Sequence, residues 1–200
     1  MNIRQVIFDL GKVLVDFSFH AFYHKLGYQP GERTLDEANE PIIAFESGKM
    51  NRQDFLAELG KIYQFEMSLP EFEYHWCNVF SPIPEMLNLA RAVRNSYEIF
   101  IFSNTDELHF PYVWQKYPEL HIFGDNLMLS YELGAVKPEE SSYLNALQKF
   151  GLKADECLFI DDRPVNIEVA EKLGMKGIIH RSYPETCRQL TEILQFSCPA

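Results

Sequence analysis

The sequence of 200 residues predicts an α/β fold in which helices cover a parallel sheet and a small helical segment is inserted after the first strand. The first observation behind this prediction is that short apolar runs alternate with segments whose apolar residues recur at helical spacing. The second is that about 90 residues separate the first apolar run from the second, far more than one crossover helix requires. The additional chain must therefore form a unit of its own.

Five short runs are the expected strands. They are rich in β-branched and aromatic residues and lack the alternation of a half-exposed strand, which is typical of strands buried on both faces. The clear ones are residues 6–8, 99–102, 158–160 and 177–179, and a weaker signal covers residues 127–130. Together they predict a Rossmann-like parallel sheet of about five strands.

Helices are expected between these strands. Apolar residues lie three and four positions apart in residues 86–93, 143–147 and 167–173. Pro164 precedes the third of these segments, at a position that suits the first turn of a helix.

The inserted segment carries helical signals and no strong strand signal. Phe19, Phe22, Tyr23 and Leu26 have helical spacing, and Asn51 is a suitable N-cap for an apolar segment that ends near residue 62. Prolines at positions 82 and 84 mark the return to the sheet. We therefore expect an α/β core domain made of residues 1–16 and 82–200, and a helical cap domain made of residues 17–81.

The composition favours small-molecule chemistry. The net charge is −11, from 29 acidic and 18 basic residues, and nucleic acids or anionic membranes demand clustered Lys and Arg. A negative protein attracts an anionic substrate only where a local cation, such as a metal ion, reverses the potential. The absence of an 18-residue apolar stretch and of a leader-like N-terminus leads us to expect a cytoplasmic protein. Four widely spaced cysteines without a CxxC pair are expected to be free thiols.

Polar residues gather where the predicted strands end. Asp9 follows the first strand, Ser103 and Asn104 end the second, and Asp161 and Asp162 end the fourth. In an open parallel sheet, ligands bind at the carboxyl ends of the strands, so we expect these side chains to meet at one edge. The loop that contains Lys137 should lie at the same edge.

These residue types suit phosphoryl transfer, in which catalysis is mostly positioning and charge compensation. A carboxylate can attack phosphorus and form an aspartyl-phosphate. The repulsion between a carboxylate and a phosphate dianion must be cancelled, and Mg²⁺ held by carboxylates and water achieves this. A serine hydroxyl and backbone amides can bind phosphate oxygens, and a lysine supplies a fixed positive charge.

Four motifs, "FDLGKVLVD", "IFSN", "VKPE" and "FIDDRPVN", stand in the order and approximate spacing of the motifs of the haloacid dehalogenase-like hydrolase superfamily, and the sequence resembles this family over nearly its whole length. The helical insertion resembles the first type of cap in that family. The opening "DLGKVLVD" is similar to a subgroup of sugar-phosphate phosphatases related to bacterial alpha-glucose-1-phosphate phosphatase.

The resemblance implies a role for each residue at the predicted edge. Asp9 would be the nucleophile and a magnesium ligand, together with the backbone carbonyl of Gly11 and the carboxylate of Asp162. The phosphoryl group would be bound by the hydroxyl of Ser103 and the amide of Asn104. Lys137 would neutralise the phosphoryl group and orient the carboxylates. Asp161 would support Lys137 or a metal-bound water, and Asn166 stands where the family often has a further acidic or amide residue.

Gly11 departs from the family pattern, which usually has a second Asp at this position to protonate the leaving group. General acid catalysis is worth about 10² to 10⁴ in rate. Three explanations stay open: a leaving group that departs readily, such as that of a sugar 1-phosphate; a proton from a cap residue such as His20 or His24 or from a metal-ordered water; or binding without turnover. Lys12, which also departs from the family pattern, is either a second cation near the phosphate or a solvated loop residue.

The sequence therefore predicts a magnesium-dependent phosphatase that acts on a small phosphorylated metabolite, most plausibly a sugar phosphate such as a hexose 1-phosphate. We expect neither a nucleic-acid partner nor a membrane, and a monomer or homodimer. The alternatives are a catalytically silent protein that binds a phosphorylated ligand or partner, and a related phosphomutase. Dehalogenation is a further alternative from the same superfamily, but it needs no magnesium and fits Asp162 poorly.

Overall fold

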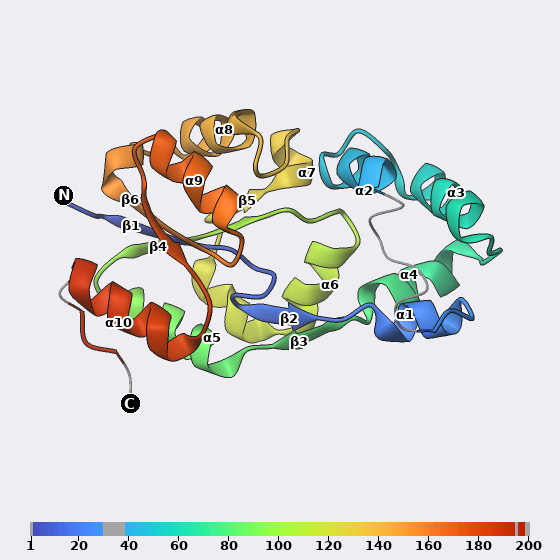
Figure 1. The fold of residues 1–200 in the computed structure, drawn as a ribbon, viewed down its shortest axis with the longest axis horizontal. Helices are drawn as coiled ribbons and strands as arrows, with labels where there is room; N and C mark the ends of the chain where they lie inside the picture. Colours follow the sequence, from blue (N-terminus) through green and yellow to red (C-terminus); the bar gives the residue numbers. More distant parts are fainter. Residues whose placement is uncertain (1, 30–38, 195, 199–200) are drawn as a thin grey trace.

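The computed structural model describes residues 2–29, 39–194 and 196–198. Its core is a five-stranded sheet in the order β5-β4-β1-β6-β7, in which every neighbouring pair is parallel (Figure 1). The strands are β1 (Gln5–Phe8), β4 (Glu98–Ser103), β5 (Leu127–Leu129), β6 (Cys157–Asp161) and β7 (Lys176–Ile179). All five predicted strands and the Rossmann-like α/β fold class are confirmed.

Helices cover both faces of the sheet (Figure 1). One face carries α5 (Pro84–Val93) and α10 (Tyr183–Leu194), and the other carries α8 (Glu140–Phe150) and α9 (Pro164–Lys172). The connections contain α6 (His109–Lys116), α7 (Ser130–Leu133) and the 3-10 helices η2 (Pro118–Phe123) and η3 (Ala154–Glu156). No helix in the described ranges is long and apolar enough to cross a membrane.

Because helices cover both faces of the sheet, the strands are apolar at successive positions and do not alternate with polar residues. Val6 and Phe8 of β1 pack into the cluster that contains α5 and α10, whereas Ile7 between them packs into the cluster of α8 and α9. All three side chains are at most 1% exposed. Successive side chains of a strand point to opposite faces, so a strand with helices on both sides must be apolar at every position.

The inserted segment is helical, as predicted, and lies at one end of the sheet (Figure 1). Its described helices are α1 (His20–Lys25), α2 (Asn39–Glu46), α3 (Arg52–Tyr63) and α4 (Leu69–Cys77). Asn51 caps α3, because its side-chain oxygen accepts hydrogen bonds from the backbone N–H groups of Gln53 and Asp54. Residues 30–38 of the predicted cap lie outside the described residues.

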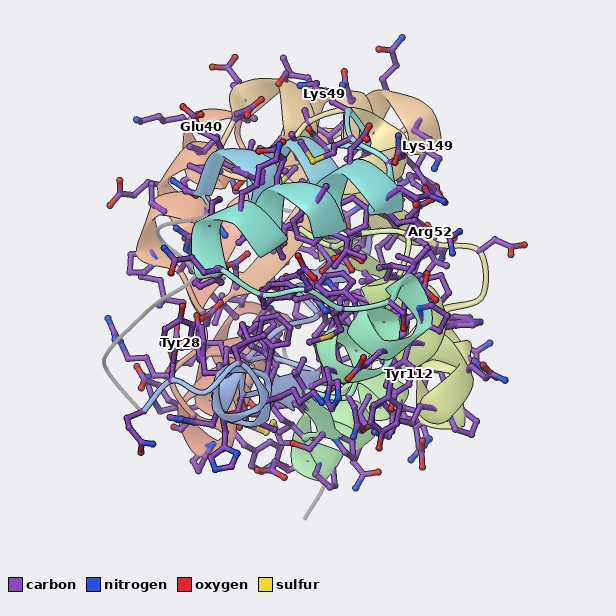
Figure 2. The ribbon with its side chains drawn as sticks, turned by 90° about the vertical axis from the view of Figure 1, so that its right-hand side faces the viewer. Tyr28, Glu40, Lys49, Arg52, Tyr112 and Lys149 are labelled. Atoms are coloured by element: carbon purple, nitrogen blue, oxygen red, sulfur yellow. A yellow bond between two sulfur atoms is a disulfide. The ribbon has the colours of Figure 1, made fainter. Side chains whose placement is uncertain are left out.

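Aromatic rings fill the interior of this helical segment. Phe22, Phe45, Phe55 and Phe72 are each at most 1% exposed, and Trp76 is 2% exposed. They form stacked and edge-to-face contacts with one another. These contacts help to stabilise a core that is small. Figure 2 looks onto this end of the molecule.

A two-stranded antiparallel ladder that the sequence did not predict joins the helical segment to the sheet. It pairs β2 (Val15–Phe17) with β3 (Phe80–Pro82). Residue 16 lies opposite residue 81, so the ladder runs across both predicted domain boundaries. The division into a core domain and a cap domain therefore stays a prediction.

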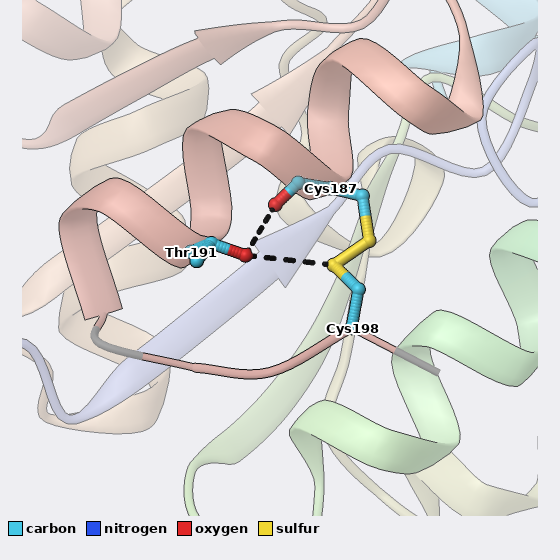
Figure 3. Close-up of a disulfide and its surroundings, with 3 residues drawn as sticks. All are labelled: Cys187, Thr191 and Cys198. Atoms are coloured by element: carbon cyan, nitrogen blue, oxygen red, sulfur yellow. Dashed lines mark hydrogen bonds between the residues drawn. A yellow bond between two sulfur atoms is a disulfide. The ribbon is translucent and has the colours of Figure 1, made fainter. Parts of the chain in front are cut away.

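The expectation of four free thiols is wrong for two of the cysteines. The sulfur atoms of Cys187 in α10 and Cys198 are bonded, whereas Cys77 and Cys157 are free and buried (Figure 3). The chain reverses after α10, which brings the two Cα atoms to 5.9 Å, within the span of a disulfide. A separation of 11 residues carries no local motif, so the sequence pattern could not identify this pair.

Gly48 allows the end of α2 and helix α7 to approach closely. It follows α2 with a φ of +68°, and a Cβ atom at this position would lie 2.3 Å from the backbone oxygen of Tyr131 in α7. Gly27 has a φ of +85° with nothing within 4 Å of such a Cβ. The two glycines therefore share a left-handed backbone but differ in what surrounds them.

We expect Gly48→Ala to lower the free energy of unfolding by about 2–4 kcal/mol, because backbone strain adds to a steric overlap. Gly27→Ala, which introduces the strain alone, should cost about 1–2 kcal/mol. Urea denaturation of the two variants measures the difference. Equal losses would show that the close approach at Tyr131 contributes nothing.

Candidate active site

The predicted residues meet at the carboxyl ends of three neighbouring strands. Asp9 directly follows β1, Ser103 ends β4 and Asp161 ends β6. Strand β1 lies between β4 and β6, and Phe8 is in register with Ile160, so Asp9 comes to lie beside Asp161. The chain leaves β1 toward β4 on one side and later reaches β6 on the other, which makes this edge the topological switch point where such sheets bind ligands.

Lys137 ties these strands together through its ammonium group. Its Nζ atom donates to Oδ1 of Asp9 at 2.8 Å, to Oδ2 of Asp161 at 2.7 Å and to the carbonyl of Phe102 at 2.9 Å. An ammonium group has three protons, so all its donors have partners. Lys137 is only 2% exposed, although it lies in a loop before α8. The lysine predicted near the site is therefore a buried cation at its centre.

The charges of this cluster keep Lys137 protonated and disfavour the ionised form of Asp9. Burial by itself would lower the pKa of Lys137, but the carboxylates of Asp9 and Asp161 outweigh it and hold that pKa above its ordinary value. Burial raises the pKa of Asp9 to about 7, Asp161 and Asp162 add to the rise, and Lys137 opposes it. The site therefore holds more negative charge than one lysine neutralises.

Asn104 positions the loop that carries Lys137. Its side-chain oxygen accepts from the backbone N–H of Lys137 at 2.7 Å, and its amide nitrogen donates to the carbonyl of the same residue at 2.9 Å. Ser103 is 2% exposed, and its hydroxyl donates to the carbonyl of Asn104 at 3.2 Å. The side chain of Asn104 thus supports the lysine, a contact that the sequence did not reveal.

Asp161 is fully occupied by hydrogen bonds. Besides Lys137, it accepts from the backbone N–H of Arg163 at 2.8 Å and, with both oxygens, from the side-chain nitrogen of Asn166 at 3.0 Å. Asp162 is half-buried and lies beside it. Asp161 therefore bonds directly to Lys137, one of the two supporting roles that the resemblance implies for it, and the role of Asp162 as a metal ligand stays a prediction.

The carboxylates form a cluster that suits a hard divalent cation. Oxygen atoms of Asp9, Asp161 and Asp162 lie within 4.8 Å of one another. The donors are all oxygens and carry an excess of negative charge. Mg²⁺ prefers such ligands, whereas softer metals prefer nitrogen or sulfur ligands. Because Asp161 is already bonded to Lys137, Arg163 and Asn166, the carboxylates that fit a metal ion best are those of Asp9 and Asp162.

A cavity of about 610 Å³ adjoins this cluster: its lining includes Leu10, Gly11 and Lys137 but none of the three carboxylates. The sheet side contributes Gly11, Ser103, Asn104, Lys137 and Arg163 to its lining. Aromatic side chains line another part of the cavity, namely Phe17, Phe19, Trp76 and Phe80. Helix α2 contributes residues spaced three, four and seven positions apart, namely Asn39, Ile42, Ile43 and Glu46.

Comparison with known proteins identifies the family. A model of the haloacid dehalogenase-like hydrolases matches residues 3–174. The chain belongs to this family. The expectation of an enzyme of this hydrolase class is therefore confirmed.

Relatives of the chain include named phosphatases. It is 29% identical over 208 residues to D-ribitol-5-phosphate phosphatase of Bacteroides thetaiotaomicron, an alignment that covers 96% of this chain and 98% of the relative. It is 25% identical to flavin mononucleotide hydrolase 1 of Arabidopsis thaliana, over 94% of this chain and 76% of that protein.

Solved structures share the fold. A predicted HAD-like hydrolase from Porphyromonas gingivalis superposes with a TM-score of 0.78 at 25% identity, over 98% of this chain and 99% of that one. A HAD family enzyme from Bacteroides thetaiotaomicron in complex with magnesium and inorganic phosphate gives a TM-score of 0.78 at 23% identity, over 90% of this chain and 94% of that one.

At position 11, where the family pattern usually has a second Asp, the ring of Phe17 lies close to the glycine. A Cβ atom on Gly11 would lie 3.0 Å from Cε1 of Phe17, which is closer than ordinary contact. Lys12 next to it forms an ion pair with Asp16, and its Nζ atom lies 4.6 Å from the centroid of the Phe17 ring. Lys12 is exposed and not part of the cavity lining, so the solvated-loop interpretation fits it better than a phosphate contact.

The two histidines considered as proton donors do not meet this need. His20 and His24 are both exposed on α1, and neither belongs to the described residues that line the cavity. Sequence reasoning missed the ionisable side chains that do line it from other elements: Glu46, His109 and Arg163.

His109 and Asp106 form a buried ion pair that links the segment after β4 to the inserted helical segment. Nδ1 of His109 lies 2.9 Å from Oδ2 of Asp106, and its Nε2 lies 2.9 Å from the carbonyl of Trp76 in α4. A carbonyl only accepts, so Nε2 carries a proton, and the carboxylate requires one on Nδ1 as well. The ring of Trp76 stacks on that of His109 with 4.8 Å between centroids. His109 is therefore an imidazolium held between Asp106 and helix α4.

The pKa of each partner follows from this pairing. Burial alone would lower the pKa of His109, but the Asp106 carboxylate and the carbonyl of Trp76 raise it above its usual value. Burial alone would raise the pKa of Asp106, but His109 and the backbone N–H groups of Leu108 and His109 hold it below its usual value.

We expect Lys137→Met to lower the free energy of unfolding by about 3–5 kcal/mol in metal-free buffer, because it leaves Asp9 and Asp161 facing each other without a cation. Lys149→Met removes an exposed pair with Glu132 and should cost about 0–1 kcal/mol. Chemical denaturation of both variants with EDTA present checks the comparison. A loss at Lys137 no larger than that at Lys149 would contradict the central role of this cation.

We expect His109→Gln to lower stability most at acidic to neutral pH. Because the folded-state pKa of His109 is raised, the native protein holds an extra proton above pH about 6.5, and the stabilisation fades as pH rises through the folded-state pKa. The difference in unfolding free energy between wild type and variant, about 1–3 kcal/mol near pH 6, should shrink toward pH 9. The exposed His24→Gln serves as control, and a pH-independent difference would exclude the imidazolium.

Proposed function

We propose that the chain is a magnesium-dependent phosphatase that hydrolyses a small phosphate monoester through an aspartyl-phosphate at Asp9. The observation that carries this proposal is the buried contact of Asp9 with Lys137, beside Asp161 and Asp162. Lys137 and the two residues after Asp9, Leu10 and Gly11, line the 610 Å³ cavity. A carboxylate held by a buried cation next to a cavity is suited to nucleophilic attack rather than to helix capping.

The residues divide the work of the first step. The free oxygen of Asp9 attacks phosphorus while its other oxygen stays bonded to Lys137, whose charge offsets the negative charge of the phosphoryl group. Ser103 and the backbone amide of Asn104 bind phosphoryl oxygens. Asp161 holds Lys137 in place, and Asn166 in turn holds Asp161.

A bound Mg²⁺ would supply further positive charge to the phosphoryl oxygens. Asp9 and Asp162 would hold it through carboxylate oxygens, and Gly11 through its backbone carbonyl. The oxygen-only donor set supports this choice of ion, and so does the magnesium in the structurally similar enzyme from Bacteroides thetaiotaomicron.

We propose a sugar phosphate, such as a hexose 1-phosphate, as substrate. The phosphatase relatives act by name on ribitol 5-phosphate and flavin mononucleotide, which supports a small phosphorylated metabolite as the general class. The opening "DLGKVLVD" supports the hexose 1-phosphate in particular, through its similarity to the glucose-1-phosphate phosphatases.

We also propose that residues 17–81 act as a cap that closes over the bound substrate. The position of α2 in the cavity lining, opposite Lys137, supports this role. Closure would exclude bulk water and strengthen the field of the metal ion and the lysine.

A screen of phosphorylated metabolites with and without magnesium tests the function. We expect phosphate release from at least one sugar phosphate with Mg²⁺, none with EDTA, and a loss of more than about 10³-fold in Asp9→Asn, because an amide cannot form the acyl phosphate. Glu66→Gln, away from the cavity lining, should match wild type. Tight binding of sugar phosphates without turnover across the panel would favour the silent binding protein instead, an outcome that Gly11 keeps open.

A further inference from the structure

The attack of Asp9 on an alkyl phosphate leaves an alkoxide that needs a proton. Position 11, the customary place for a donor in this family, has no side chain, and a Cβ atom there would come within 3.0 Å of the ring of Phe17. Any donor that belongs to the protein must therefore enter the cavity from another element. Five ionisable side chains line the cavity in the described part of the chain: Glu46, His109, Lys137, Glu139 and Arg163.

Four of these five do not suit proton donation. Lys137 and His109 are bonded through all their protons on nitrogen within the hydrogen-bond networks described above. The guanidinium of Arg163 does not release a proton near neutral pH. Glu139 is exposed just before the first residue of α8, so water surrounds its carboxyl group.

Glu46 differs from the others in position and surroundings. It is the last residue of α2, on the same face as Asn39, Ile42 and Ile43, and this face lines the cavity opposite the sheet. Glu46 is thus a partly buried acid on the cap side of the cavity whose other side contains Lys137.

The charges around Glu46 leave it close to a balance between its two forms. Burial raises its pKa to about 7 and Asp106 adds to the rise, while His109, Lys137 and Arg163 oppose it. Helices α3 and α7 also pack against α2, but Arg52 of α3 is paired with Glu73 and Glu107. Glu132 of α7 is paired with Lys149. A general acid works best when its pKa is close to the working pH.

We propose that Glu46 protonates the leaving group, in place of the residue that is missing at position 11. This inference rests on the proposed phosphatase function. As the bond between phosphorus and the ester oxygen breaks and the bond to Asp9 forms, the proton of the Glu46 carboxyl group moves to the ester oxygen. The product alcohol leaves neutral, and Glu46 remains as a carboxylate that regains a proton from water in the next step.

A comparison of two esters tests this role. Nitrophenyl phosphate releases a stable anion that needs no proton, whereas glycerol phosphate releases an alkoxide that does. We expect Glu46→Gln to lower kcat/KM for glycerol phosphate by about 10² or more and to leave that for nitrophenyl phosphate within about threefold of wild type. Because kcat/KM covers only the steps up to the departure of the leaving group, hydrolysis of the intermediate does not affect it.

Glu40→Gln is the matched control. Glu40 lies on the same helix, is exposed and is not part of the cavity lining, so both esters should react as in wild type (Figure 2). In wild type, the ratio of the glycerol to the nitrophenyl kcat/KM should fall as pH rises through about 7, and this fall should be absent in Glu46→Gln. The ratio removes ionisations that both reactions share, including that of the nucleophile.

Equal losses for both esters, or a raised KM with an unchanged ratio, would make Glu46 a binding residue and overturn the proposal. An unchanged ratio with no loss at all would overturn it as well. Failure of the phosphatase function looks different: wild type would release no phosphate from either ester, or Asp9→Asn would remain active.

Discussion

The organisation of this protein depends on one buried cation. Lys137 touches the residues that end or follow three adjacent strands, and it is the contact that allows two carboxylates to lie together in a dry interior. Isolated charges of this kind are costly to bury, so the ion cluster requires a scaffold that fixes each partner. The parallel sheet supplies Asp9 and Asp161 through its register, and Asn104 supplies the backbone position of the lysine.

The cluster also explains how a protein of net charge −11 can receive a phosphate ester. The general surface repels anions, but the cavity floor contains Lys137 and its lining includes Arg163. The site has more carboxylates than lysines, which favours the binding of a divalent cation. A bound cation would make the local potential positive. Attraction is thus local, and it depends on groups that the rest of the fold holds in place.

A second ion pair performs a comparable task at the boundary with the cap. Before α6, Oδ1 of Asp106 accepts from the backbone N–H groups of Leu108 and His109. Its other oxygen pairs with the ring of His109, which contacts Trp76 of α4. This contact joins a helix of the cap to the edge of the sheet that bears the active site. It also lies close to Glu46, so the charge that ties cap to core contributes to the acidity of the residue that we propose as proton donor.

The sequence by itself determined the sheet, the helical insertion and the set Asp9, Ser103, Lys137, Asp161 and Asp162, because apolar periodicity and the residues after each strand are local properties of the chain. It did not determine the ladder of β2 and β3, the pair of Cys187 and Cys198, or the positions of Glu46 and His109. These depend on which segments distant in the chain pack against each other. The side chain that replaces a missing acid can come from any element that borders the cavity, and only tertiary packing decides which one does.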